Sequence, residues 1–111
     1  MIQTVLAIFA GVLVLVGVLG FVIPADKALT SGAPAYNIFH LCFGALGGAI
    51  AMWGHDGSIR AFLIGFGVID LYQAVASRQN WFPKPQFKWR PADDVLHVVV
   101  GIALVAIGIA G

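Results

Sequence analysis

The sequence predicts an all-α membrane protein, with four transmembrane helices in a bundle made of two tandem helical-hairpin repeats. Three observations lead to this prediction. Of the 111 residues, 60% are apolar and only 10% are charged, a balance that would leave a soluble domain of this size with an apolar surface. Four long apolar segments fill the chain, each close to the roughly 20 residues that cross a bilayer. The second and fourth segments also share a pattern of polar residues, which indicates an internal repeat.

The first predicted span covers residues 2–23, most of which are Val, Leu, Ile, Ala and Gly. Pro24 begins a polar connection and so marks the end of the helix. A secretory signal peptide is the alternative, but no basic residue precedes the apolar stretch, and the stretch is longer than the roughly 7–15 apolar residues of a signal. We therefore interpret residues 2–23 as a true span.

The second and third predicted spans, residues 37–53 and 59–77, are separated by a short turn. Asn37 is a residue type that caps helix N-termini, and the apolar run from Ile38 follows it directly. The turn contains two glycines among polar residues, a composition typical of a break between helices. Because the four spans leave no room for a separate soluble domain, residues 1–111 are expected to form one transmembrane domain.

The last connection and the fourth predicted span, residues 93–110, differ in character. The connection carries four Lys or Arg residues among four Trp or Phe residues. This mixture is typical of a segment at the membrane interface, where aromatic rings lie among lipid headgroups. Pro91 suits the first turn of a helix, and Asp93 and Asp94 suit the positive end of its dipole. These three residues predict the start of the fourth span.

The basic residues predict how the spans are oriented. Lys and Arg concentrate in the cytoplasmic connections of membrane proteins. Five of the six belong to the first and third connections, whereas Arg60 follows the second. We therefore predict a multi-pass protein of the cell inner (plasma) membrane with both termini outside. The five residues are Lys27, Arg78, Lys84, Lys88 and Arg90.

The internal repeat is clearest where residues 35–44 match residues 92–101. In both segments a polar residue is followed three positions later by a histidine and four positions after that by a glycine. Residues 11–15 also match residues 67–71, with an offset that differs by one residue. Because each half contains two spans, both halves are expected to insert in the same direction, with the histidines at equal depth. The matching positions are Asn37, His40 and Gly44 in the first half and Asp94, His97 and Gly101 in the second.

This pair of N/D-x-x-H-x-x-x-G motifs resembles a family of small bacterial four-helix transmembrane proteins of unknown function. The resemblance covers nearly the whole chain and implies a four-helix membrane fold, but it implies no activity. The chain departs from the family pattern at Asp94, where the family more often has asparagine. It also departs at Asp70 and Gln73, which place polar groups in the third span.

The two histidines are the first candidate site. His40 and Gly44 are four residues apart, as are His97 and Gly101, so each pair shares one face of a helix. In one interpretation the imidazoles bind a b-type haem while the glycines let the porphyrin approach the backbone. In another, each histidine forms a hydrogen bond across the bundle and each glycine permits close helix packing. A metal site or a proton relay at the same histidines also stays open.

Asp70 is the second candidate, because it lies near the middle of the third span. An ionised carboxylate there costs about 2.5 kcal/mol or more, so this side chain is expected to be neutral, paired or next to a wet cavity. Gln73 follows three residues later and extends this polar intramembrane site. One interpretation is a polar site formed together with His40 and His97. The other is a single hydrogen bond between helices that specifies packing.

Several functions are not supported by the sequence. The net charge is only +1 and there is no basic run, so we expect no nucleic-acid partner. The motifs of hydrolases, phosphate-binding loops and thiol redox sites are absent, so an enzyme is not favoured. Cys42 is the only cysteine and cannot form an internal disulfide.

The leading functional prediction is a non-enzymatic integral membrane protein that acts through helix packing, as a small subunit or oligomer of a membrane complex. The glycine-rich faces of the first two spans would contact other copies of the chain, or other membrane subunits, within the lipid bilayer. One alternative is a b-type haem or proton/electron-transfer module that uses His40 and His97. Another is a small-solute or ion pathway in an oligomer.

Overall fold

The computed structural model describes residues 1–24, 26–28 and 30–111 and is built from helices. Its four long helices are α1 (Ile2–Val22), α2 (Pro34–Trp53), α3 (Asp56–Gln79) and α5 (Pro91–Ala110), and α4 (Lys84–Phe87) is a single turn in the last connection. The described residues contain no strand. The all-α prediction is therefore confirmed, and each of the four long helices is long and apolar enough to cross a membrane.

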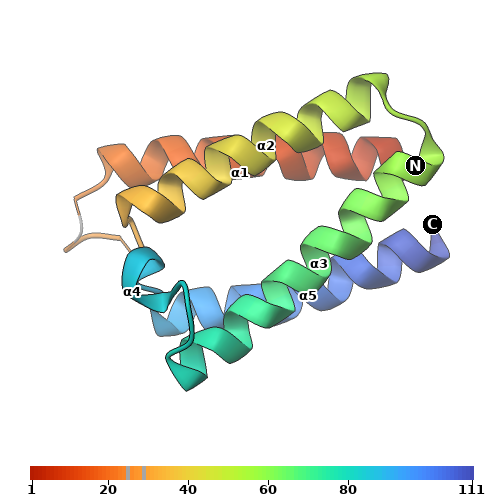
Figure 1. Ribbon diagram of the computed structural model, residues 1–111. Helices are drawn as coiled ribbons and strands as arrows, with labels where there is room; N and C mark the ends of the chain where they lie inside the picture. The colour runs from red at the N-terminus through yellow and green to blue at the C-terminus, as the bar shows by residue number, and fades with distance from the viewer. Residues whose placement is uncertain (25, 29) are drawn as a thin grey trace.

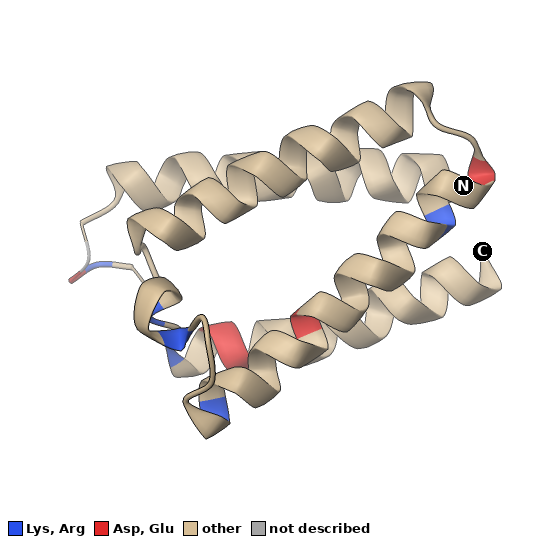
Figure 2. Cartoon of the chain, in the orientation of Figure 1, with Lys and Arg blue, Asp and Glu red and all other residues tan. Residues whose placement is uncertain are grey.

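The long helices form two antiparallel hairpins, which Figure 1 shows one above the other. In one hairpin α1 packs along α2, and in the other α3 packs along α5. Both chain ends lie at one end of the molecule, which we call the terminal end, while α4 and the α1–α2 connection lie at the other, the loop end. The Lys and Arg residues gather at the loop end apart from Arg60, which is near the start of α3 (Figure 2).

Polar first turns extend the helices beyond the apolar runs. Pro34 and Pro91 occupy the first turns of α2 and α5, where a missing N–H group is tolerated. Helices α2, α3 and α5 begin two or three residues earlier than the predicted starts at residues 37, 59 and 93. The prediction that Asn37 caps a helix is wrong, because Asn37 lies inside α2 and its Nδ2 donates to the carbonyl of Gly32 at 2.9 Å.

Equivalent features recur in the two hairpins at a constant spacing. Helices α2 and α5 both have 20 residues, and their first prolines, Pro34 and Pro91, are 57 residues apart. The side chains of Gln3 and Arg60, also 57 residues apart, each donate a hydrogen bond to a backbone carbonyl 48 residues further along the chain, at 2.6 and 3.1 Å. These two bonds connect α1 to α2 and α3 to α5 at the terminal end.

Close helix contacts follow the same spacing and correct one sequence match. A Cβ atom added to Gly44 would lie 3.0 Å from the carbonyl oxygen of Ala10, and one added to Gly101 would lie 2.9 Å from that of Gly67. Gly67 thus makes the contact in its hairpin that Ala10 makes in the other. The predicted match of Gly67 with Gly11 is off by one residue, and Gly11 has no neighbour within 4 Å of an added Cβ among the described residues.

An apolar core joins the hairpins at the terminal end. Its most buried side chains are at most 5% exposed and come from all four long helices. Phe9 and Phe66, on α1 and α3, lie edge to face with ring centroids 5.5 Å apart. The space between the hairpins is thus filled with hydrocarbon at this end. These side chains are Ile2, Leu6, Ala51, Ile59, Leu63, Phe66 and Leu104.

The outer surface is also apolar. Large aliphatic side chains from all the long helices are exposed, and several expose more than 60% of their surface. Soluble proteins rarely expose contiguous apolar surface on this scale, whereas lipid-facing helices do so routinely. The strongly exposed examples include Ile8, Val22, Met52, Val95 and Ile109.

Candidate functional site

A cavity of about 190 Å³ lies between the two hairpins, near the loop end, and all four long helices line it. Five of its lining side chains are titratable and belong to α2, α3 and α5. Helix α1 contributes only apolar side chains. We call this space the polar cavity, and its titratable residues are Tyr36, His40, Asp70, Asp93 and His97.

Tyr36 connects the two predicted histidines. Tyr36 and His40 are one turn apart on α2, and their ring centroids are 4.2 Å apart. The Tyr36 hydroxyl and His97 Nε2 are 2.6 Å apart and form a hydrogen bond between the hairpins. The tautomer of His97 decides which of the two atoms donates. The structure thus brings His40 and His97 to one cavity through a residue that neither motif includes.

Each histidine has a buried ring nitrogen with no hydrogen-bond partner. The exposed fractions of His40 and His97 are 8% and 6%, and Nδ1 of each makes no hydrogen bond to the described residues. Buried polar atoms are nearly always paired, so each exception calls for an explanation, such as a group that binds there. Here two such atoms belong to residues from different hairpins that line the same cavity.

A second series of polar contacts begins at Asp70. Its Oδ1 accepts a hydrogen bond from Gln73 Nε2 at 3.3 Å, and Gln73 Oε1 accepts one from Trp89 Nε1 at 3.1 Å. All three side chains are at most 5% exposed. Asp70 lines the polar cavity, whereas Gln73 does not. Trp89, from the segment that the sequence predicts at the membrane interface, is buried inside the protein, and its N–H group completes this series.

The lining of the polar cavity carries carboxylates and no Lys or Arg in the part of the chain that the structure describes. Asp93 Oδ2 accepts hydrogen bonds from the backbone N–H groups of Arg90 and Ser31, both at 2.8 Å, and so caps α5 as predicted. Asp70 accepts a hydrogen bond from the side-chain amide of Gln73. The cavity is therefore suited to neutral or cationic groups and unsuited to anions.

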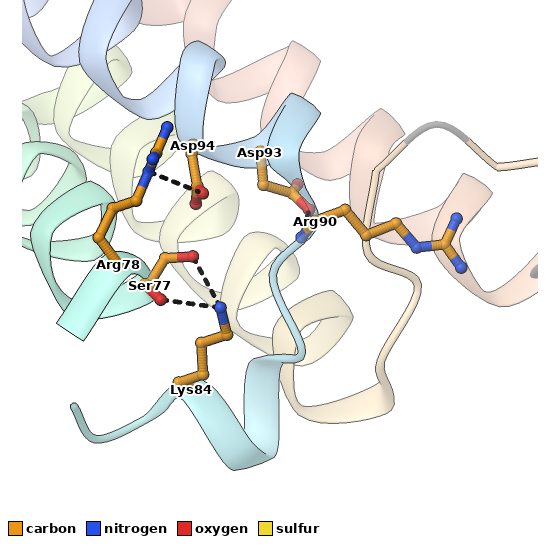
Figure 3. Close-up of polar contacts among 6 residues, drawn as sticks. All are labelled: Ser77, Arg78, Lys84, Arg90, Asp93 and Asp94. Carbon is orange, nitrogen blue, oxygen red and sulfur yellow. Dashed lines mark hydrogen bonds and ion pairs between the residues drawn. The ribbon is translucent and has the colours of Figure 1, made fainter. Parts of the chain in front are cut away.

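Basic side chains at the loop end form polar contacts with neighbouring helices and connections (Figure 3). Lys84 Nζ donates to the carbonyl and the hydroxyl of Ser77, at 2.8 and 3.1 Å. Asp94 lies in the first turn of α5, as predicted, and its Oδ2 is 3.8 Å from Arg78 Nε in an ion pair. The Arg90 side chain extends to the α1–α2 connection, where it donates to a backbone carbonyl. These contacts tie both connections to the helices beneath them.

The two predicted glycines do not line the polar cavity. Gly44 faces α1, where an added Cβ would lie 2.6 Å from Val14 Cγ2. Gly101 faces α3, where an added Cβ would lie 2.9 Å from Leu71 Cγ. Both glycines serve close packing within their own hairpin, so the backbone beside them is not open to a porphyrin.

The cavity residues do not fit a haem held by two histidines. Nε2 of His97 is hydrogen-bonded to the Tyr36 hydroxyl and is not free to bind iron, and the tyrosine ring lies against His40. The volume of about 190 Å³ is also below the roughly 300–1,000 Å³ of pockets that hold drug-sized ligands. The described residues include no group of three or more His, Cys, Asp or Glu side chains placed to hold a metal ion.

Two cavity residues were not recognised from the sequence as part of a site. Tyr36 precedes His40 by four residues and therefore shares its helix face, a signal that could have been read. For Asp93, the sequence predicts only a position at the start of the fourth span. Its second role was not visible, because it depends on how the two hairpins meet.

Comparison with models of protein families, with curated proteins and with solved structures finds no match to this chain.

Proposed function

We propose that the chain is a multi-pass membrane protein, built from two tandem hairpin repeats, that binds a small hydrogen-bonding ligand in the polar cavity without catalysing a reaction. The apolar outer surface supports insertion into a bilayer, and the constant 57-residue spacing of Pro34 and Pro91 and of Gln3 and Arg60 supports the repeat. The resemblance to the small bacterial family stays a prediction beside this proposal.

One observation carries the proposal: the polar cavity lies between His40 and His97, two histidines over nine-tenths buried, each with an unpaired ring nitrogen. Leaving a polar atom unpaired in a protein interior costs about 1–3 kcal/mol. Apolar residues at both positions would avoid this cost. A ligand that reached the ring nitrogens would recover it, which would give the histidines a role beyond the Tyr36–His97 hydrogen bond.

The apolar core favours binding over transport. Towards the terminal end, the space between the hairpins is filled by side chains such as Leu6 and Leu63, both 0% exposed. An ion or polar solute that left the polar cavity in this direction would have to cross hydrocarbon without partners. A single copy of the chain therefore forms a site that is closed towards the terminal end and not a pathway across the membrane.

The glycine faces give less support to a role based on packing with partners. Added Cβ atoms on Gly17, Gly20 and Gly44 would meet atoms of the neighbouring helix at 2.7, 1.9 and 2.6 Å, so these glycines are used inside the first hairpin. Among the described glycines inside the long helices, only Gly11 and Gly65 have open space beside them. A small-residue interface for oligomers or other subunits is thus limited to these two isolated positions.

For orientation, we propose that the loop end faces the cytoplasm and that both termini lie outside the inner membrane. The positive-inside rule supports this choice, because Lys27, Arg78, Lys84, Lys88 and Arg90 all belong to the loop end.

Fluorescence of Trp89 tests the proposed binding. The Trp89 ring centroid lies 6.1 Å from that of His97, beside the polar cavity. In lipid nanodiscs, a Trp53→Phe, Trp81→Phe variant leaves Trp89 as the only tryptophan of the three. We expect at least one of the small probes n-butylamine, n-butanol and n-butyrate to change this fluorescence saturably.

A matched pair of substitutions controls for effects on the lipid. Val12 lines the polar cavity, so Val12→Phe is expected to fill part of it and remove the saturable response. Val68 is 54% exposed and lies on α3 outside the cavity lining, so Val68→Phe is expected to leave the response unchanged. A response to all three probes that is linear and equal in both variants would contradict the proposed function.

A further inference from the structure

We propose that the ligand of the polar cavity is a cationic amphiphile, a protonated amine on an alkyl chain, which enters from the lipid between α1 and α5. This inference rests on the proposed ligand-binding function and adds the chemical class of the ligand and its route.

The charges around the cavity favour a cation. Two carboxylates and no Lys or Arg line it among the described residues. The Asp93 carboxylate already accepts two backbone hydrogen bonds, whereas Asp70 has a 3.3 Å contact with the Gln73 amide. Carboxylates inside membrane spans are normally paired with a cation or a polar partner. An ammonium group beside Asp70 would supply such a pair, and an anionic headgroup would be repelled.

Aromatic rings surround the same space. Phe9, Tyr36 and Phe66 line the polar cavity from α1, α2 and α3. The face of an aromatic ring attracts a cation, and this attraction is strongest where water is excluded. The lining therefore offers an ammonium group both a counter-charge and ring faces, in a volume of about 190 Å³ that admits only a small headgroup.

An apolar groove lies beside the cavity and fits an alkyl chain. The groove has a volume of about 360 Å³, and α1 and α5 line it entirely with apolar side chains. Phe9, Val12 and Val100 line both the groove and the polar cavity, so the two spaces adjoin. The groove also faces outwards, since Ile8 and Val99 on its rim are 65% and 60% exposed. A headgroup in the cavity would place its chain in this groove.

The route follows from where the positive charges lie. A cation arriving from water at the loop end meets the basic residues there, including Lys84 and Arg78. The side between α1 and α5 carries no charge among the residues that line the groove. An amphiphile dissolved in the bilayer reaches the cavity along this side without crossing the basic end.

Three probes with the same chain and different headgroups test the ligand class. Dodecylamine, dodecanol and dodecanoate are titrated into nanodiscs that contain the Trp89 reporter. Alkylamines are protonated at neutral pH, so the three headgroups are cationic, neutral and anionic. We expect dodecylamine to bind at least about tenfold more tightly than the other two. Equal or tighter binding of dodecanol or dodecanoate would overturn the cationic assignment.

Two substitutions test the headgroup and the chain separately. Asp70→Asn is expected to weaken dodecylamine binding about tenfold or more while dodecanol binding changes less than about twofold. Ala103 lines the groove but not the polar cavity, so Ala103→Phe is expected to weaken dodecylamine binding and leave n-butylamine binding unchanged. The matched control Ala61→Phe, on the exposed surface of α3, is expected to change neither.

The outcomes separate this inference from the proposed function. If no butyl probe binds saturably, the ligand-binding function itself fails. If butyl probes bind but Ala103→Phe has no effect on dodecylamine, the function stands and the lateral route is wrong. Should Asp70→Asn fail to fold, the comparison of the three headgroups in the unsubstituted cavity still decides the ligand class.

Discussion

Trp89 has a different environment from the aromatic residues near it in the sequence. Trp81 and Phe82 are 50% and 73% exposed, but Trp89 is only 5% exposed. Its indole N–H donates to Gln73, which in turn donates to Asp70. From its composition, the whole segment that contains Trp81, Phe82 and Trp89 was predicted to lie at the membrane interface. Only the fold distinguishes Trp89, because its partner lies 16 residues away on another element.

Replacing Trp89 should lower the free energy of unfolding, because it breaks this series of hydrogen bonds. Trp89→Phe keeps an aromatic ring but leaves Gln73 Oε1 without its donor in a buried position. We expect the free energy of unfolding in mixed micelles to fall by about 1–3 kcal/mol, measured by circular dichroism during titration with SDS. The control Trp81→Phe, on an exposed side chain, is expected to change it by less than about 0.5 kcal/mol. Equal effects of the two variants would show that the contact has no energetic importance.

Other residues show what sequence patterns can and cannot place. His40 and His97 were predicted to share a site because their motifs match, and the structure places both at one cavity. Tyr36 was missed although the helical period puts it on the face of His40. Asp70 reaches that cavity, but whether α3 would bring it level with the histidines depended on the relative stagger of helix ends, which no local pattern specifies.

At the scale of elements, the hairpins are held by close contacts between small residues. Gly101 and Gly67 face each other across α5 and α3, and an added Cβ on either would lie 2.9 Å from the carbonyl oxygen of the other. Apolar runs predicted these helices well, because a bilayer requires long uninterrupted segments. The helix starts were less predictable, since their first turns are polar and do not differ in composition from a connection.

A methyl group added at this contact should force α3 and α5 apart. Gly101→Ala is expected to lower the free energy of unfolding by about 1–3 kcal/mol, because backbone atoms on both sides limit relaxation. Gly65→Ala, on the same hairpin with no neighbour within 4 Å, is expected to be neutral or to raise it by up to about 1 kcal/mol. Thermal unfolding in detergent measures both. A loss in Gly65→Ala as large as in Gly101→Ala would exclude close packing as the cause.

At the scale of the whole molecule, the arrangement of the two hairpins creates the site. Each hairpin supplies one histidine, and the space between them is apolar at the terminal end and polar at the loop end. The internal repeat predicted which helices pair within a hairpin, whereas the shortest connection joins α2 to α3, which belong to different hairpins. How the hairpins face each other was not predictable, because the apolar surfaces that meet there, such as Phe9 against Phe66, look in the sequence like the surfaces that face lipid.

The central claim is that both hairpins cross the membrane in the same direction and so bring His40 and His97 to one cavity. Labelling of single cysteines by a membrane-impermeant maleimide in intact cells tests this claim most directly. In a Cys42→Ser background, Asp26→Cys and Gln86→Cys probe the two connections at the loop end, and His55→Cys probes the opposite end. We expect the two loop-end cysteines to be equally protected and the cysteine at position 55 to be labelled. Labelling of one loop-end cysteine and protection of the other would show that the hairpins point in opposite directions, and the shared cavity could not exist.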